Sequence, residues 1–221
     1  MLQITPARCD SIPLIHILNE VILHVTNETN VKQCNKGVAM PLIFACIAPH
    51  AGDLIPETIA DQNIVAPTRK SMYAMGSTLE SLKPETVVII NPHGFRVQGV
   101  LSVSVAERAT AYWASDVKLD FEMDPTIANA IADKATEMNV PVVKYIYGAS
   151  SGPECFVPLD WGAVVPLYFM GHRFTPKPKI VHCSPMRTLP LATHYEFGRA
   201  IGRVLKESDK RIAFIASADQ G

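Results

Sequence analysis

Short apolar runs alternate along the chain with longer segments whose apolar residues recur at helical spacing. The short runs predict buried strands, and they cover residues 42–47, 87–90, 100–105, 140–147, 179–183 and 211–216. The longer segments predict helices, and they cover residues 66–83, 124–138, 159–170 and 193–206. This alternation predicts an α/β fold, a layered sandwich with a mixed, mostly parallel central sheet flanked by helices.

One predicted strand differs in pattern from the others. Residues 100–105 alternate apolar with polar side chains, whereas the run at residues 87–90 is continuously apolar. Alternation is typical of a strand with one solvated face. Because this run also follows closely on the strand before it, we expect it to be an antiparallel, partly exposed member of the sheet.

The region before Met40 does not resemble the rest of the chain. Residues 12–25 are apolar but are interrupted by polar side chains, among them His16 and His24. Two interpretations stay open. Either residues 1–39 are a translated leader ahead of a natural start at Met40, or they form a helix packed on the domain. The codons that can encode the residues just before Met40 include a bacterial ribosome-binding sequence, which favours the leader.

We place the domain at residues 40–221. The chain stops at residues 217–221, directly after an apolar run, where an active-site loop should begin. We therefore expect the C-terminal part of the domain to be missing, and we expect a chain that ends at Gly221 to have little or no activity. A tolerated exposed tail is the alternative.

The composition limits the class of protein. Apolar residues make up 48% of the chain and charged residues 19%, which fits a globular domain with a sizeable core. The net charge is -1 and no block of lysine or arginine occurs, so we expect no nucleic-acid partner. The five cysteines include no CxxC pair, which favours a reducing, cytoplasmic setting. No apolar run approaches the ~20 residues of a membrane span, so we expect no membrane association.

Two of the predicted strands end in similar motifs that contain histidine. Ala48–Gly52 (Ala-Pro-His-Ala-Gly) and Asn91–Gly94 (Asn-Pro-His-Gly) each follow an apolar run. In an open α/β sheet, ligands bind at the carboxyl ends of the strands. We therefore expect His50 and His93 to converge on one metal ion, because imidazole suits Zn, Cu, Fe and Ni. A strand-end histidine that only caps a turn is the alternative.

A metal centre needs more ligands than two histidines. A non-haem Fe(II) site takes two histidines and one carboxylate, and a zinc hydrolase takes three ligands and a water. The candidate carboxylates in this chain are Asp53, Glu57 and Asp219. Each is individually a weak candidate, because such acids more often cap helices or face water.

The remaining features carry weaker signals. We expect His182 to be a hydrogen-bonded core histidine, His194 to lie at the surface, and His172 to lie in a polar loop. Residues 148–158 form the longest flexible stretch, which we interpret as a surface loop, with a lid over the site as the alternative. The sequence holds no GxGxxG, GxxxxGK[ST] or GxSxG motif.

Four segments occur in an order and spacing that resemble a known family. They are residues 48–52, 91–94, 159–167 (Leu-Asp-Trp-Gly-Ala-Val-Val-Pro-Leu) and 217–221 (Ser-Ala-Asp-Gln-Gly). Together they resemble the class III extradiol ring-cleavage dioxygenases, the superfamily of the catalytic (LigB-type) subunit of protocatechuate 4,5-dioxygenase. The resemblance covers Met40 to Gly221.

The resemblance implies a site and a reaction. His50 and His93 match the two iron-binding histidines of the family, so the implied cofactor is Fe(II). The implied reaction is cleavage of a catechol-like ring next to its diol, with insertion of both atoms of O2. The family's iron-binding glutamate and its acid/base histidine would both follow Gly221, so no catalytic residue is assigned here. Many relatives carry histidine where this chain has Trp161, which implies an altered pocket.

Other functions and several details stay open. The same superfamily contains Memo-like proteins, which share the fold and histidine placement but act in signalling or as metal-binding proteins. A zinc-dependent hydrolase built on the same histidines is a third candidate. The resemblance does not select a substrate among protocatechuate, gallate, homoprotocatechuate, aminophenols and other catechols. We expect a homo-oligomer, with or without a small partner subunit.

Overall fold

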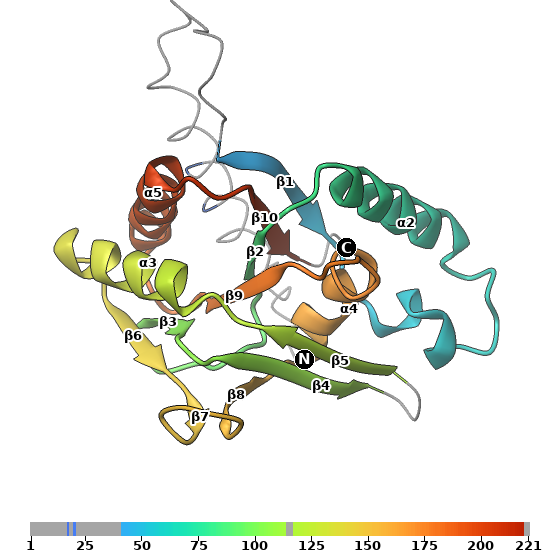
Figure 1. Ribbon diagram of the computed structural model, residues 1–221, viewed down its shortest axis with the longest axis horizontal. Coiled ribbons are helices and arrows are strands. Elements are labelled where there is room, and N and C mark those ends of the chain that lie inside the picture. The colour runs from blue at the N-terminus through green and yellow to red at the C-terminus, as the bar shows by residue number, and fades with distance from the viewer. Residues whose placement is uncertain (1–16, 18–19, 21–40, 114–116, 219–221) are drawn as a thin grey trace, which may run out of the picture.

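Figure 1 shows the computed structural model of the chain, which describes residues 17, 20, 41–113 and 117–218. A six-stranded sheet forms its centre, with strand order β1-β10-β2-β9-β3-β6. The strands are β1 (Leu42–Ala48), β10 (Ile212–Ser217), β2 (Thr86–Ile90), β9 (Lys179–Ser184), β3 (Leu101–Ser104) and β6 (Val142–Tyr145). All neighbours in this sheet are parallel except β3 and β9. The predicted mixed, mostly parallel sheet is therefore confirmed.

Strand β3 is antiparallel to β9, as predicted, but the prediction that it is partly exposed is wrong. All four of its residues are buried. Its polar side chains are satisfied inside the protein, because Ser102 Oγ donates to the carbonyl of Phe95 and Ser104 Oγ accepts from the amide of Ala106 at 3.4 Å. In this strand the alternating serines are therefore buried and form hydrogen bonds to nearby loops, and they do not lie on a solvated face.

The sequence patterns did not predict a second, four-stranded sheet. Its strands follow the order β5 (Val117–Glu122), β4 (Arg108–Trp113), β8 (Cys155–Pro158) and β7 (Tyr147–Gly148). On β4 and β5, alternate side chains such as Ala109 and Leu119 are buried, and Arg108 lies on the opposite, solvated face. The segment at 148–158, predicted as a flexible loop, therefore contributes a strand to this sheet.

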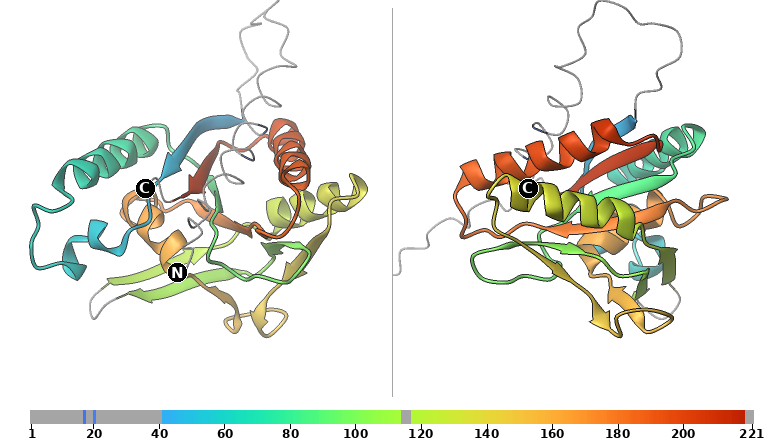
Figure 2. Two further views of the ribbon diagram at one scale, coloured as in Figure 1. Left: turned by 180° about the vertical axis from the view of Figure 1, so that it is seen from behind. Right: turned by 60° about the vertical axis from the view of Figure 1, so that its left-hand side comes forward.

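Helices cover both faces of the central sheet. They are α2 (Ala66–Ser81), α3 (Pro125–Glu137), α4 (Trp161–Phe169) and α5 (Leu191–Glu207), and two short 3-10 turns follow β1 at Gly52–Leu54 and Pro56–Thr58. Helices α3 and α5 lie together over one face (Figure 2), and α2, α4 and the second sheet lie over the other, with an apolar core on each side. This arrangement is the predicted layered sandwich.

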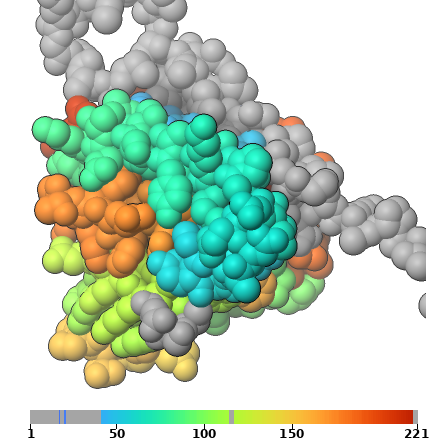
Figure 3. Space-filling view, turned by 90° about the vertical axis from the view of Figure 1, so that its right-hand side faces the viewer, coloured from blue at the N-terminus to red at the C-terminus, as the bar shows by residue number. Residues whose placement is uncertain are grey.

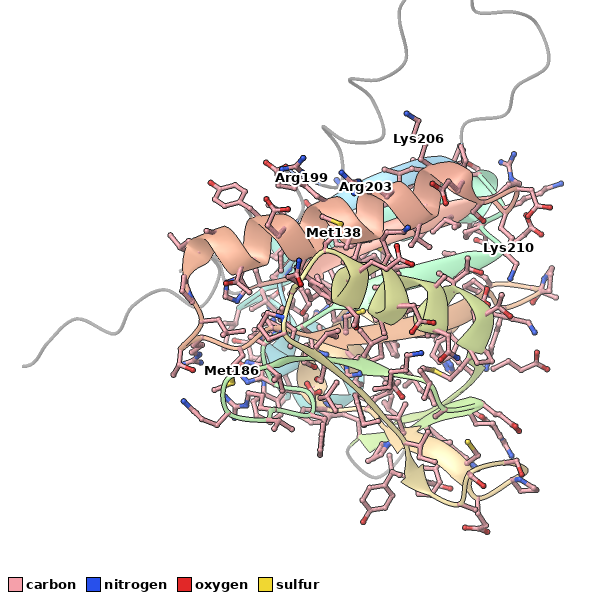
Figure 4. The ribbon with its side chains drawn as sticks, turned by 90° about the vertical axis from the view of Figure 1, so that its left-hand side faces the viewer. Met138, Met186, Arg199, Arg203, Lys206 and Lys210 are labelled. Carbon is pink, nitrogen blue, oxygen red and sulfur yellow. The ribbon has the colours of Figure 1, made fainter. Side chains whose placement is uncertain are left out.

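The surfaces of the two faces differ. On the α3–α5 face, Arg199, Arg203 and Lys206 extend outward from α5 (Figure 4), and Arg199 pairs with Glu196 at 3.1 Å. On the opposite face, the segment that follows β1 lies between α2 and the second sheet (Figure 3). Within the described residues, no helix is long and apolar enough to cross a membrane.

The described part of the N-terminal region touches α5. Ile17 is fully buried, and a Cβ atom built on Gly198 would lie 2.7 Å from its carbonyl oxygen. Glycine at position 198 therefore allows this close approach. His16 and His24 lie outside the described residues, and the domain boundary at Met40 stays a prediction.

Candidate metal centre

The two motif histidines meet at the carboxyl edge of the central sheet. Strand β10 lies between β1 and β2, so His50 and His93 approach each other over the end of β10. Their Nε2 atoms are 3.0 Å apart, and the ring planes are nearly perpendicular at 85°. His50 is buried and His93 is half-buried. The structure thus brings together the two residues that the sequence singled out.

The spacing of the two nitrogens suits a shared ion. Imidazole nitrogens bind zinc at ~2.0–2.1 Å, so two of them at a tetrahedral or right angle on one ion lie about 2.8–3.4 Å apart. The observed 3.0 Å between His50 Nε2 and His93 Nε2 falls in this range. The donor set and its spacing therefore fit a metal of the imidazole-binding class.

The orientation of His50 follows from a proline in α4. Pro166 has no N–H, so the carbonyl of Gly162, four residues earlier, lacks its helical donor. Ser217 at the end of β10 donates its hydroxyl to that carbonyl. The Ser217 oxygen then accepts from His50 Nδ1 at 3.0 Å. This bond places the proton of a neutral His50 on Nδ1, so the lone pair on Nε2 is directed at His93.

The loop that carries His93 is held by its own first residue. The Asn91 side chain accepts from the amide of His93 at 2.9 Å, which forms an Asx turn with Pro92 in the middle. Gly94 follows at a very close approach, because a Cβ atom there would lie 2.1 Å from Ser184 Oγ and 2.7 Å from the His182 ring. The residues of the Asn-Pro-His-Gly motif therefore hold His93 close to the edge of the sheet.

Aromatic side chains flank His93 on the rim of the site. Trp161 begins α4 behind the N-cap residue Asp160, and its ring centroid is 4.3 Å from that of His93. The Trp161 side chain is 42% exposed, and Phe95 is 49% exposed. An aromatic or apolar molecule that approaches His93 would contact Trp161.

The described residues do not complete a set of three ligands. Across residues 41–113 and 117–218, no group of three or more His, Cys, Asp or Glu side chains is placed to hold an ion. Glu57 accepts hydrogen bonds from the hydroxyl of Tyr168 at 3.0 and 3.1 Å, and neither it nor Asp53 joins the histidine pair. Asp219 lies outside the described residues.

Of the other histidines, His182 and His172 lie where the sequence predicted, and the prediction for His194 is wrong. His182 is buried and hydrogen-bonded to Asn91 and Tyr145, as predicted, and burial lowers the pKa of its imidazole. His194 is fully buried, so its predicted surface location is wrong. It lies three residues before the buried Phe197 and thus on the same helix face. His172 is half-buried beside Tyr168, and burial lowers its pKa.

Three residues with roles in this site were not assigned one from the sequence. Asn91, Pro166 and Ser217 all stand inside the quoted motifs, but the sequence pattern assigns no separate role to any of them. Pro166 carried a usable signal, since a proline inside a helix leaves the carbonyl four residues before it without a partner. That Ser217 is the donor to this carbonyl depends on the fold.

Comparison with known proteins gives two matches. A family model described as the catalytic LigB subunit of aromatic ring-opening dioxygenase matches residues 45–220. Protein CA_C1420 of Clostridium acetobutylicum is 25% identical over 178 residues, which make up 78% of this chain. The chain spans 38% of the length of that curated relative.

Proposed function

Because the chain belongs to the family of the catalytic LigB subunit of aromatic ring-opening dioxygenases, we propose that it is a non-haem Fe(II)-dependent extradiol dioxygenase. Its substrate is a catechol-like aromatic, and its second substrate is O2. The observation that carries the proposal is the 3.0 Å separation of the Nε2 atoms of His50 and His93 at the carboxyl edge of the sheet.

The described residues have separate tasks in this proposal. His50 and His93 hold the metal through Nε2, and Ser217 keeps the proton of His50 on Nδ1. Bound Fe(II) supplies two-point binding of the diol oxygens and a route for electrons from the ring to O2. The sequence resemblance puts the third ligand and the acid/base histidine after Gly221.

The rim of the site supports an aromatic substrate. Trp161 is 42% exposed and its ring lies against His93, and Phe95, two residues after His93, is also exposed. An aromatic ring bound next to His93 would bury part of these side chains, and aromatic pairs add about 0.5–1.5 kcal/mol beyond the area they bury.

The test is anaerobic loading of the full-length protein with Fe(II), followed by O2 uptake with a panel of catechols and aminophenols. We expect uptake and a yellow ring-opened product with at least one of them. His50→Ala and His93→Ala should each abolish both metal binding and uptake. Thr86→Val, which alters a buried side chain at the far end of β2, is the control and should retain both.

Two other outcomes would redirect the assignment. Iron binding that depends on both histidines, without uptake for any member of the panel, would favour a Memo-like metal-binding protein. A wild-type protein that binds neither Fe(II) nor Zn(II) would reduce His50 and His93 to structural roles and would refute the proposal.

A further inference from the structure

A buried polar network lies directly behind the loop that carries His93. His182 on β9 is 1% exposed, and its two ring nitrogens contact different elements. Nε2 meets the Asn91 side-chain amino group, and Nδ1 lies 2.9 Å from the hydroxyl of Tyr145 on β6. Strands β9 and β6 and the loop that follows β2 thus meet at one imidazole. None of these three side chains belongs to the proposed metal ligands.

The direction of every bond in this network is determined. The Asn91 carbonyl oxygen must face the amide of His93, which it accepts at 2.9 Å, so the amino group must face His182. His182 Nε2 is therefore an acceptor, and its proton resides on Nδ1. A doubly protonated His182 would set an N–H against the Asn91 amino group, so only the neutral ring fits.

The network continues beyond the imidazole. His182 Nδ1 donates to the Tyr145 oxygen, and Ser104 is a further hydrogen-bond partner of the same side chain. Burial lowers the pKa of His182, with Asp160 acting weakly in the opposite sense. Burial raises the pKa of Tyr145. Both groups are therefore neutral at physiological pH, as the bond directions require.

The same elements hold the other end of the loop. The Phe95 ring stacks on Tyr145 with centroids 4.5 Å apart and planes at 22°, and the Phe95 carbonyl accepts from Ser102. Between the two ends, Gly94 touches the His182 ring so closely that no Cβ atom fits. His93 is thus carried on a five-residue loop. Before His93 the loop is held by Asn91, which contacts His182, and after His93 it is held by Phe95, whose ring stacks on Tyr145.

We infer that His182 and Tyr145 are positioning residues that fix the side chain of Asn91 and, through the Asx turn, the place of the metal ligand His93. The inference rests on the proposed function only in taking His93 as a ligand. It does not depend on which substrate is bound. The essential contact is the acceptor that His182 Nε2 offers to Asn91.

Two substitutions of His182 separate this role from a merely structural one. In His182→Gln the side-chain amide reaches the place of Nε2 and can accept from Asn91. In His182→Asn the shorter amide reaches only the place of Nδ1, so Asn91 loses its acceptor while Tyr145 keeps a partner. Both variants bury a neutral amide in place of the imidazole, so a purely structural role predicts similar effects.

The first readout is anaerobic titration of the full-length protein with Fe(II), with Co(II) as a spectroscopic probe. We expect His182→Asn to weaken metal binding about 10- to 100-fold, the usual range for groups that orient a ligand. His182→Gln should remain within about threefold of wild type, and Tyr145→Phe should fall between them because its ring still stacks on Phe95. Thr86→Val at the far end of β2 should bind like wild type.

The second readout uses the metal-free protein. In wild type, 15N NMR should show a neutral His182 with its proton on Nδ1, and the His93 amide should exchange slowly with solvent. That amide should exchange faster in His182→Asn and stay protected in His182→Gln.

Each outcome then decides a different point. If the wild type binds metal and the two His182 variants bind it with equal affinity, the positioning role is overturned and the proposed function stays intact. A proton on Nε2 of His182 would also overturn it. A wild type that binds no metal would overturn the proposed function and the ligand-positioning role together.

Discussion

The two ends of strand β2 carry buried polar networks of opposite character. At the amino end, Thr86 donates to Asp124 at 2.8 Å, and Lys210 lies 2.6 Å from the same carboxylate oxygen. At the carboxyl end, Asn91 opens a loop in which His93 faces His50 through two nitrogens of the same kind. The first network joins an anion to a cation from the same chain, whereas the second brings two potential donors to a metal together.

The difference shows which buried polar groups find all their charge and hydrogen-bond partners within this chain. Burial alone would raise the pKa of Asp124, but hydrogen bonds from Lys210, Thr86 and the Ile127 amide outweigh it and lower the pKa. That carboxylate is stabilised by this chain's own residues. At the other end, the Nε2 atoms of His50 and His93 lie 3.0 Å apart, a spacing that two imidazole ligands on one cation would also have.

Among substitutions at the two ends of β2, we expect Gly94→Ala to have the largest effect on metal affinity. The new methyl group would overlap Ser184 Oγ and the His182 ring, at 2.1 and 2.7 Å. The loop must then move, so we expect a loss of metal affinity of more than about 100-fold, beyond the range for orienting groups. Overpacking should also lower the free energy of unfolding by about 1–3 kcal/mol. Metal titration and urea unfolding measure the two effects.

A second substitution identifies the cause. Ser184 Oγ is buried with no hydrogen-bond partner among the described residues, so Ser184→Ala alone should be nearly silent. In the double variant Gly94→Ala/Ser184→Ala it removes the shorter contact and should recover part of the stability. Gly152→Ala, at a positive φ of 78° with open space around it, controls for the loss of glycine freedom. An equal loss of metal affinity in Gly152→Ala would contradict the steric argument.

The next largest effect is expected from Ser217→Ala. It removes the acceptor of His50 Nδ1, so the proton of His50 is no longer held on that nitrogen. The carbonyl of Gly162 also loses its donor. We expect metal binding to weaken about 10- to 100-fold, measured by anaerobic Fe(II) titration. Ser184→Ala is the matched control, and equal affinities in the two variants would rule out the orienting role of Ser217.

The contrast between the two ends also explains what the sequence could predict. Continuous apolar runs such as that of β2 are unambiguous, and the motifs that follow them identified both His50 and His93. The alternation of β4, with small alanines on its inner face, is a weak signal, so the second sheet was not predicted. A polar pattern alone did not distinguish buried serines such as Ser102 from solvated ones.

The contact between the two histidines depends on the order of strands in the sheet, which no local sequence pattern reveals. β10, almost at the end of the described chain, inserts between β1 and β2. Its last residue, Ser217, pairs with Ala48 in the sheet register. This brings the serine under His50. The order of strands thus brings these distant segments together. The two histidines were therefore predictable as candidates, and the groups that support them were not.

At the amino end of β2, Lys210→Met should change stability and leave metal binding unchanged. The variant leaves the buried Asp124 carboxylate without its cation, which should lower the free energy of unfolding by about 1–3 kcal/mol at pH 7. Urea unfolding measures this loss. Lys179→Met, which breaks an exposed pair with Glu122, is the control and should cost less than about 1 kcal/mol.

The effect of Lys210→Met should depend on pH in a defined direction. The folded-state pKa of Asp124 lies below its ordinary value, so its contribution to stability is present above about pH 4 and is lost as the pH falls through the folded-state pKa. The gap between wild type and variant should therefore be full at pH 7 and narrow toward pH 2. A constant gap over this range would mean that the ion pair is not its source.

The smallest effect is expected at the rim of the carboxyl end, from Trp161→Leu. This change removes an aromatic face beside His93 without altering a proposed ligand, so metal affinity should stay at the wild-type level. Loss of an aromatic pair is worth about 0.5–1.5 kcal/mol, which corresponds to about 2- to 13-fold weaker binding of catechol to the Fe(II)-loaded protein under anaerobic conditions.

Calorimetry measures that binding, and Tyr147→Leu, on the edge strand β7 and 61% exposed, is the control for loss of a surface aromatic. Trp161→His introduces the residue that many members of the family carry at this position. If it binds catechol as weakly as Trp161→Leu but gains affinity for a catechol with a carboxylate substituent, the indole selects for apolar rings. Unchanged catechol affinity in both variants would place the substrate away from Trp161 and leave the carboxyl end of β2 with a metal site but no aromatic wall.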